Sequence, residues 1–273
     1  MTAPLFHAHR RQPGFSMVEL MVALAIGSVL TLVVAQLFQN TRSTNRAQEE
    51  AARMQENTRF ALATIARTVR LAGYTSDPTV VAATIYDSAG PPRPALAGTD
   101  AAAPGSDTLT VRFQGGGAFV AGAEVADNTV VNCLGTPVLP DYAGVLPPSY
   151  NKFSISQGAD LRNALFCQTT DGDNTAGTEL VSGIEAMQVL FGEDTSNPAD
   201  SVPNKFVRPS DVGNASKVVA VRVYLLISGT QGVRLDNTAI SYPMAGETYA
   251  YPAGDMKLRR VATTTVTLRN RVP

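Results

Sequence analysis

Few side chains in this chain are suited to acid–base or nucleophilic chemistry. Its 273 residues include two histidines, His7 and His9, both within the first ten positions. Removal of that segment would leave no imidazole, and therefore no Ser-His-Asp or Cys-His nucleophile, zincin motif or histidine general base. The glycine run at residues 115–117 does not match G-x-G-x-x-G, and no G-x-x-x-x-G-K-[ST] loop is present. The sequence predicts a protein that is not an enzyme and needs no metal or cofactor, with chemistry based on carboxylates or a lone serine or lysine as the alternative.

One acidic stretch has oxygen ligands at alternating positions. Asp171-Gly172-Asp173-Asn174 suits Ca²⁺ in this respect. The EF-hand pattern nevertheless fails at Ala176, where its loop needs glycine, and at Ser182, where it needs glutamate. We therefore expect a solvent-exposed turn, and calcium binding is the alternative.

One carboxylate lies at the start of a long apolar segment. Between Phe15 and Phe38 the only charged side chain is Glu19, and the 22 residues from 20 to 41 are uncharged. At about 1.5 Å per helical residue they reach ~33 Å, enough to cross the hydrocarbon core of a bilayer. A carboxylate costs on the order of 2.5 to 3.5 kcal/mol at the bilayer centre and less near the interface. Glu19 is therefore either an interfacial residue without a further role or a group that awaits a cation.

The residues before the apolar segment predict its orientation. Residues 1–14 contain Arg10 and Arg11 and no acidic residue, which favours a cytoplasmic position for this end and an extracytoplasmic position for the rest. A cleaved secretory signal is the alternative. The apolar run is longer than the usual 7 to 15 residues, however, and no small-x-small cleavage site precedes Asn40.

A family resemblance begins at these residues. The run Gly14-Phe15-Ser16-Met17-Val18-Glu19-Leu20, between a basic leader and an apolar helix, resembles the prepilin cleavage signature of type IV pilins and type II secretion pseudopilins. By this resemblance, prepilin peptidase cuts between Gly14 and Phe15 and N-methylates Phe15. Glu19 would then pair with the amino terminus of an adjacent subunit as the helix passes from the membrane into a filament. A cut after Gly14 would place the new α-amine of Phe15 about one helical turn from Glu19.

The helical pattern continues beyond the apolar segment. No proline occurs between Pro13 and Pro78, so we expect the helix to run to about Ala72 and to stop at Gly73. Apolar residues at spacings of three, four or seven form one stripe, namely Ala47, Ala51, Met54, Ala61, Ile65, Val69 and Ala72. The charged residues expected on the solvated face are Arg46, Glu49, Glu50, Arg53, Glu56 and Arg59. A coiled coil is the alternative, but the repeat is short and its alanines favour packing on a sheet.

After Gly73 the composition shifts to strands and turns. The predicted strands are Val80–Tyr86, Thr108–Phe113, Thr129–Leu134, Lys152–Ser156, Ala164–Gln168, Ile184–Phe191, Val218–Ile227 and Val261–Leu268. The expected fold class is α+β, with one long amino-terminal helix packed on an antiparallel β-sheet head. The expected parts are a leader (1–14), a membrane-spanning and filament-core helix (15–41), an amphipathic helix (42–73) and a β-rich head (74–273).

Two cysteines, Cys133 and Cys167, lie in the predicted extracytoplasmic head, where thiols are oxidised. An even pair in that compartment argues for one disulfide, and two unpaired buried cysteines are the alternative. Closing a loop of about 35 residues would stabilise the head by roughly 3 to 4 kcal/mol. The formal net charge of -1, without a basic block, argues against nucleic acid as a partner.

Segments at the end of the predicted helix and in the predicted head extend the resemblance to PilW-type minor pilins. They are Met54–Leu62, Val69–Tyr74, Val181–Val189, Val218–Val223, Arg259–Val261 and Leu268–Asn270. The resemblance implies a minor pilin in a complex that primes type IV pilus assembly, at or near the pilus tip. Its implied partners are other minor pilins, the major pilin, prepilin peptidase, the pilus assembly platform, the inner membrane and a tip adhesin. Because Glu19 is retained, the extreme tip position is not expected.

Two other functions fit the same pattern. One is a minor pseudopilin of the J type, which serves type II secretion and shares much of this plan. The other is a single-pass anchored enzyme, binding head or adhesive head, in which the loops at 88–106 or 194–216 would contact a ligand or surface.

Overall fold

The computed structural model describes residues 14–75, 84–85, 93–140, 149–169, 177–234 and 236–271. The chain divides into two compact units, Met1–Gln48 and Glu49–Pro273, with the boundary inside the long helix. Residues 1–13 of the basic leader and the acidic stretch at 171–174 lie outside the described residues. Of the predicted strand Val80–Tyr86, only β1 (Thr84–Ile85) is described, and it pairs with β2 (Arg93–Pro94).

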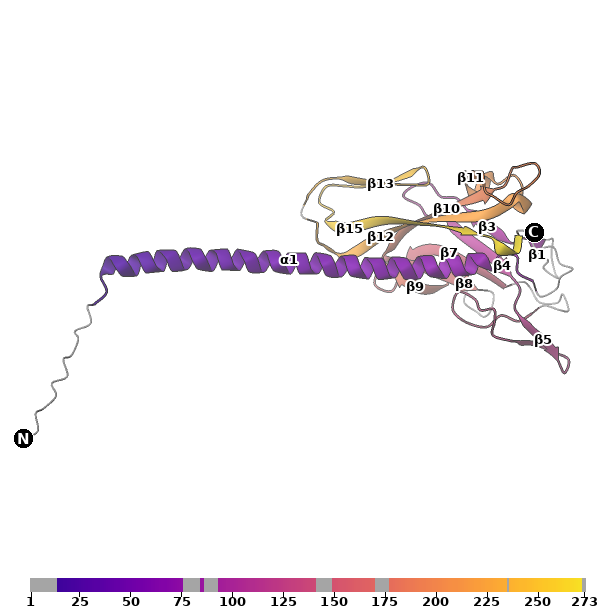
Figure 1. The fold of residues 1–273 in the computed structure, drawn as a ribbon, viewed down its shortest axis with the longest axis horizontal. Coiled ribbons are helices and arrows are strands. Elements are labelled where there is room, and N and C mark those ends of the chain that lie inside the picture. Colours follow the sequence, from indigo (N-terminus) through magenta and orange to yellow (C-terminus); the bar gives the residue numbers. More distant parts are fainter. Residues whose placement is uncertain are drawn as a thin grey trace, which may run out of the picture. The chain divides into compact units, whose positions relative to one another are not determined.

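The predicted long helix is α1, Met17–Arg70 (Figure 1). A turn at residues 71–73 follows it and contains the predicted stop, Gly73, whose φ of 74° suits glycine. The Gly73 N–H donates to the carbonyl of Arg112 at 3.0 Å. The N–H groups of Leu71 and Ala72 close the last turn on the carbonyls of Thr68 and Val69, both at 3.0 Å, and Gly73 attaches the end of the helix to the head.

The second part of α1 buries one face in the unit that begins at Glu49. The predicted stripe residues Met54, Ala61, Ile65 and Val69 are buried in the main core. Two expectations were wrong, since Ala51 is exposed and Glu50, predicted on the solvated face, is buried.

Glu50 is buried because the head supplies hydrogen-bond donors for its carboxylate. The Thr230 N–H donates to Oε2 at 2.7 Å, and the Thr230 hydroxyl donates to Oε1. Burial by itself raises the pKa of Glu50, but these hydrogen bonds, together with Arg53 and Arg162 nearby, lower the pKa below its ordinary value. Hydrogen bonds between Glu50 and Thr230, which are 180 positions apart in sequence, thus set the position of this turn of α1 on the head.

This arrangement predicts an acid-sensitive contribution to stability. Because the pKa of Glu50 is lower in the folded state, its carboxylate stabilises the fold above about pH 4.3, and the contribution is lost as the pH falls through the folded pKa. We expect Glu50→Gln to lower the free energy of unfolding by about 1.5 kcal/mol at neutral pH and by less in acid. The measurement is urea unfolding of the detergent-solubilised chain, followed by circular dichroism at both pH values. Glu49→Gln is the matched control, since Glu49 is exposed, and an equal effect of both variants would contradict the prediction.

One sheet of the head has five antiparallel strands in the order β3-β4-β7-β8-β9. Their bounds are β3 (Leu96–Thr99), β4 (Thr108–Phe113), β7 (Ser149–Gln157), β8 (Asn163–Thr169) and β9 (Thr178–Ser182). Three were predicted: β4 has the predicted bounds, whereas β7 and β8 extend beyond theirs. At Gly183, with φ of 83°, the chain passes from β9 into the second sheet.

The second sheet has the order β11-β10-β12-β15 and is also antiparallel. Its strands are β11 (Lys205–Val207), β10 (Ile184–Glu193), β12 (Val218–Gly232) and β15 (Lys257–Thr267). Val221, Val223 and Leu225 of β12 join the core with α1, whereas Leu226 faces a smaller cluster with Met244 and Tyr249. Both faces of β12 are therefore covered, which explains its nearly continuous apolar run.

Two hairpins were not predicted. They are β5 (Gly117–Val120) with β6 (Ala123–Ala126), and β13 (Ile240–Met244) with β14 (Glu247–Tyr251). Both turn on an Ala-Gly pair with positive φ, at 51° and 85° for the first and 52° and 89° for the second. Asn-Gly or Asp-Gly is the usual signal for such a turn, and neither occurs here. Short 3-10 helices at Pro209–Asp211, Ala215–Lys217 and Arg269–Arg271 complete the described elements.

The predicted strand Thr129–Leu134 was wrong. The Asn132 side chain accepts hydrogen bonds from the N–H groups of Leu134 at 2.9 Å and Thr136 at 3.0 Å. These local bonds form a turn that competes with a strand, and one bridge between Val131 and Pro137 is all that remains of the pairing in this segment.

Asp107 joins the two sheets at the start of β4. Its carboxylate is buried and accepts hydrogen bonds from the N–H groups of Ala101 and Val189, both at 2.8 Å. Burial raises the pKa of Asp107 despite these bonds. Ser106 beside it pairs with both backbone groups of Met187, so side chains occupy part of the edge of β10 that β11 does not reach.

Candidate functional site at the amino-terminal helix

The first part of α1 presents an apolar surface on every side. Fifteen large apolar side chains from Phe15 to Phe38 are exposed, from 48% for Val33 to 92% for Phe15. Among the described residues, α1 is the one helix that is long and apolar enough to cross a membrane. Soluble monomers rarely expose an apolar surface of this extent, so lipid or other helices must cover it.

The polar side chains of this segment include three hydroxyls that suit a lipid environment. Ser28 donates to the carbonyl of Ala25, Thr31 to that of Gly27, and Thr41 to that of Leu37, each at 2.8 Å. Hydroxyls that bond within their own helix do not need water as a partner. Arg42 lies over the Phe38 ring at 5.5 Å and is the first charged residue after Glu19.

The helix begins with a capping box. The Ser16 N–H donates to Oε2 of Glu19 at 3.0 Å, and the Glu19 N–H donates to the Ser16 hydroxyl at 3.2 Å. This reciprocal pair satisfies two of the N–H groups that a helix start leaves without a partner. Sequence reasoning missed Ser16, although the S-x-x-E spacing is a recognised signal for this cap. Glu19 thus has a structural partner within its own chain before any contact with another subunit.

The Gly14–Phe15 bond lies before the first helical residue. Both residues are exposed, and a Cβ added at Gly14 would meet no atom within 4 Å. This peptide bond is therefore exposed and lies outside the helix, where a peptidase could reach it. Cleavage at Gly14, methylation of Phe15 and pairing by Glu19 stay predictions.

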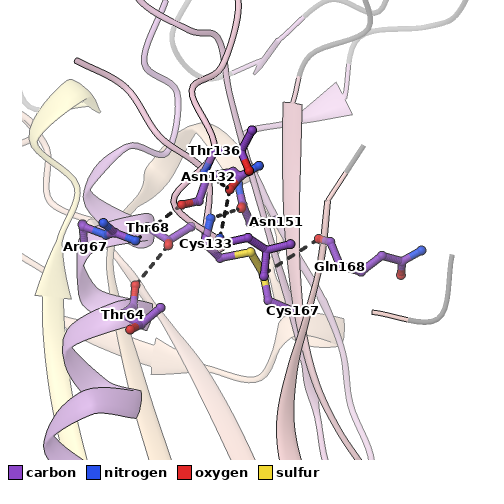
Figure 2. Close-up of a disulfide and its surroundings, with 10 residues drawn as sticks. Thr64, Arg67, Thr68, Asn132, Cys133, Thr136, Asn151, Cys167 and Gln168 are labelled. Carbon is purple, nitrogen blue, oxygen red and sulfur yellow. Dashed lines mark hydrogen bonds between the residues drawn. A yellow bond between two sulfur atoms is a disulfide. The ribbon is translucent and has the colours of Figure 1, made fainter. Parts of the chain in front are cut away.

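In the other unit, the two predicted cysteines form a disulfide, with their Cα atoms 6.5 Å apart (Figure 2). The bond joins the turn that contains Asn132 to β8, and the Cys133 N–H donates to Oδ1 of Asn151 on β7 at 2.7 Å. Arg67 of α1 donates to the Asn132 carbonyl at 3.4 Å. Figure 2 shows these groups together beside α1, so the disulfide holds a turn that the helix also contacts.

A buried ion pair connects two of the segments on which the family resemblance rests. Arg259 Nε lies 2.7 Å from Glu185 Oε2, and Arg259 Nη2 lies 2.8 Å from Asp255 Oδ2. The Tyr251 hydroxyl donates to Glu185 at 2.5 Å, and its ring lies 3.5 Å from the Arg259 guanidinium carbon. Glu185 is the second residue of β10 and Arg259 lies on β15, so this cluster fixes both strands against the hairpin β13–β14.

The pKa shifts in this cluster arise from burial and from hydrogen bonds among its own side chains, which is typical of a structural role. Burial by itself raises the pKa of Glu185, but hydrogen bonds from Arg259, Tyr251 and Ser228 lower it overall. Burial and the Glu185 hydrogen bond both raise the pKa of Tyr251. A pocket of about 350 Å³ borders Glu185 and Tyr251, but their polar atoms already have protein partners. Within the described part of the chain, no three His, Cys, Asp or Glu residues gather in a way that could hold a metal ion.

Comparison with known proteins gives matches at both ends of the chain. Residues 152–270 match the family model of PilW, the type IV pilus-assembly protein W, and residues 9–35 match the prokaryotic N-terminal methylation motif. No curated protein matches the chain. A solved type IV-like pilin from Thermus thermophilus is 16% identical, with a TM-score of 0.48, and the alignment covers 81% of this chain and 99% of that one. The two family matches contain Gly14, Phe15 and Glu19 at one end and Glu185 and Arg259 at the other.

Proposed function

We infer that this chain, a PilW-type pilin by its amino terminus and its head, is a minor subunit that primes assembly of a type IV pilus at or near the tip. Its role in pilus assembly follows from the two family matches. The observation that carries the proposal is the exposed apolar helix that begins with a capped Glu19. Lipid covers such a surface in the membrane, and the apolar helices of neighbouring subunits cover it in a filament.

Cleavage of the leader prepares Glu19 for the passage of the helix from the membrane into the filament. Hydrolysis between Gly14 and Phe15 by prepilin peptidase leaves an ammonium group on Phe15, which is then N-methylated. Ser16 stays in the mature chain, so the capping box survives cleavage. One carboxylate oxygen of Glu19 accepts the Ser16 N–H, and the carboxylate retains acceptor capacity for the ammonium group of an adjacent subunit. Pairing the two charges offsets the cost of holding either one in an apolar surrounding.

The proposal assigns a place to each part of the chain. Residues 1–14 form a cytoplasmic leader, 15–41 span the inner membrane and later lie in the filament core, 42–73 pack on the head, and 74–273 form a periplasmic and then extracellular head. The partners are other minor pilins, the major pilin, prepilin peptidase, the assembly platform and a tip adhesin.

The test is to remove this chain from its cells and count the pili. If the chain is a priming subunit, its removal should lower the number of pili strongly, and the remaining pili should keep their normal length. In wild-type cells, antibody against the head should label one end of each filament. Complementation with the wild-type chain should restore the number. Unchanged piliation with loss of protein secretion would instead assign the chain to a secretion pseudopilus. Full complementation by a soluble head that lacks residues 1–41 would favour the anchored binding head.

A further inference from the structure

The hairpin β5–β6 has one face that is apolar and exposed. Ala118 lies opposite Val125 and Val120 lies opposite Ala123, so these four side chains share a face. All four are exposed, with Val120 at 54% and Val125 at 49%. We call them the hairpin face.

The opposite face of the hairpin is less exposed to solvent. Gly117, Glu124 and Ala126 on that side are only partly exposed. The charged residue of the hairpin, Glu124, therefore lies away from the hairpin face. The hairpin face is uncharged. Other exposed large apolar residues lie apart from one another, for example Phe60 on α1, Leu161 between β7 and β8, and Val202 between β10 and β11.

The tip of the hairpin is apolar as well. Ala121 has a φ of 51° and Gly122 a φ of 85°, the conformation of a two-residue hairpin turn. Asn, Asp or Gly normally occupies the first of these positions, because a Cβ there is sterically disfavoured. An alanine at this position extends the uncharged surface to the end of the hairpin.

Contacts at the base of the hairpin fix its position, and the side chains of the hairpin face take no part in them. A Cβ at Gly117 would lie 2.0 Å from the carbonyl oxygen of Val125, so the strands approach closely there. The Asp127 N–H donates to the Gly116 carbonyl at 3.0 Å, and the Thr129 hydroxyl donates to Asp127 at 2.6 Å. Figure 1 shows the hairpin projecting from the two sheets of the head. A fixed, projecting apolar face is preorganised for binding.

We propose that the hairpin face docks on an apolar, uncharged surface on the head of a neighbouring, different pilin in the same assembly. The size of the face argues for a partner that is already held nearby, and the neighbours of a minor subunit in the proposed function are other pilins. Two valines and two alanines cover far less than the roughly 800 Å² per partner of a stable complex, so the face cannot hold a free partner by itself. A pilin that is already tethered through the apolar helices is present at high effective concentration, and a small contact then suffices. The proposal takes its neighbour from the proposed function and rests on it.

The test uses the full chain in its own membrane, with a photo-crosslinking residue at Ala123. The crosslinked product should be a second, different pilin, identified by mass spectrometry. The double variant Val120→Thr and Val125→Thr keeps side-chain shape and strand preference but replaces two methyl groups with hydroxyls, and should reduce this product roughly ten-fold. The matched control is Val202→Thr, which changes an exposed valine at 57% outside the hairpin and should have no effect.

The outcomes separate the docking proposal from the proposed function. Wild-type crosslinking of Ala123 to a second copy, an adhesin, lipid or no protein would overturn the docking proposal, as would equal crosslinking in the double variant. Recovery of wild-type chain with N-methylated Phe15 in sheared filaments would keep the proposed function in each of these cases. Absence of the wild-type chain from filaments would instead refute the proposed function.

Discussion

Replacing Glu19 with alanine is expected to leave membrane insertion and cleavage intact but to reduce the amount of this chain in sheared filaments about ten-fold or more. The helix remains apolar and long enough to span the bilayer, so insertion does not need the carboxylate. In the filament, however, the ammonium group of an adjacent Phe15 would lose its partner in an apolar surrounding. An uncompensated charge of this kind costs several kcal/mol, and each factor of ten corresponds to about 1.4 kcal/mol. The measurement is quantitative immunoblotting of membrane and filament fractions.

Two further variants separate the charge of Glu19 from its role in the capping box. Glu19→Gln keeps an oxygen that can accept the Ser16 N–H but removes the charge. Ser16→Ala removes the hydroxyl that accepts the Glu19 N–H but keeps the charge. We expect Glu19→Gln to be as defective as Glu19→Ala, and Ser16→Ala to be incorporated nearly normally. The reverse order would assign Glu19 to helix capping alone.

Replacing Cys133 and Cys167 together with serine is expected to lower the free energy of unfolding of the head by roughly 3 to 4 kcal/mol. The two cysteines are 34 positions apart, and the disulfide restricts the unfolded chain accordingly. Both are buried, and the bond also anchors the turn that Arg67 contacts from α1. The double variant avoids a single unpaired thiol, which would exchange with other proteins.

Chemical unfolding of the detergent-solubilised chain, followed by circular dichroism, measures this effect. Wild type treated with a reductant should unfold at the same denaturant concentration as the double variant. The double variant itself should not respond to the reductant. An unchanged midpoint in the variant would contradict a stabilising disulfide.

The long helix could be predicted because its evidence is local. The absence of proline, the uncharged run and the spacing of Met54, Ala61, Ile65 and Val69 are all visible within one segment. Glu50 could not be placed, because its burial depends on Thr230, which lies 180 positions away. A carboxylate in an amphipathic helix is predicted to face solvent unless the hydrogen-bond donor from a distant part of the chain is known.

The head shows the same division between local and long-range evidence. The strands β4, β7, β8, β10, β12 and β15 contain apolar or β-branched runs and were predicted, and their antiparallel arrangement is confirmed. The hairpins that turn on Ala-Gly lack the usual turn residues and were missed. The turn at Asn132 replaced a predicted strand because one side chain accepts two backbone hydrogen bonds.

The candidate site was easier to predict from the sequence than the contacts that hold the head together. Gly14, Phe15 and Glu19 lie in one short motif, and the matched methylation motif contains all three. Ser16 belongs to the same motif and was recognisable by its spacing from Glu19. The ion pair between Glu185 and Arg259, by contrast, joins residues 74 positions apart and needed the fold to be seen.

The most direct test of the account is the chemical identity of the mature amino terminus. Mass spectrometry of the chain from membrane and sheared-filament fractions should find N-methylated Phe15 in both, and Gly14→Ala should abolish it and leave the leader attached. That result would establish processing at the predicted bond and entry of the processed chain into a filament. An intact Met1 start in the wild-type chain, or a cut after the apolar helix, would contradict the account.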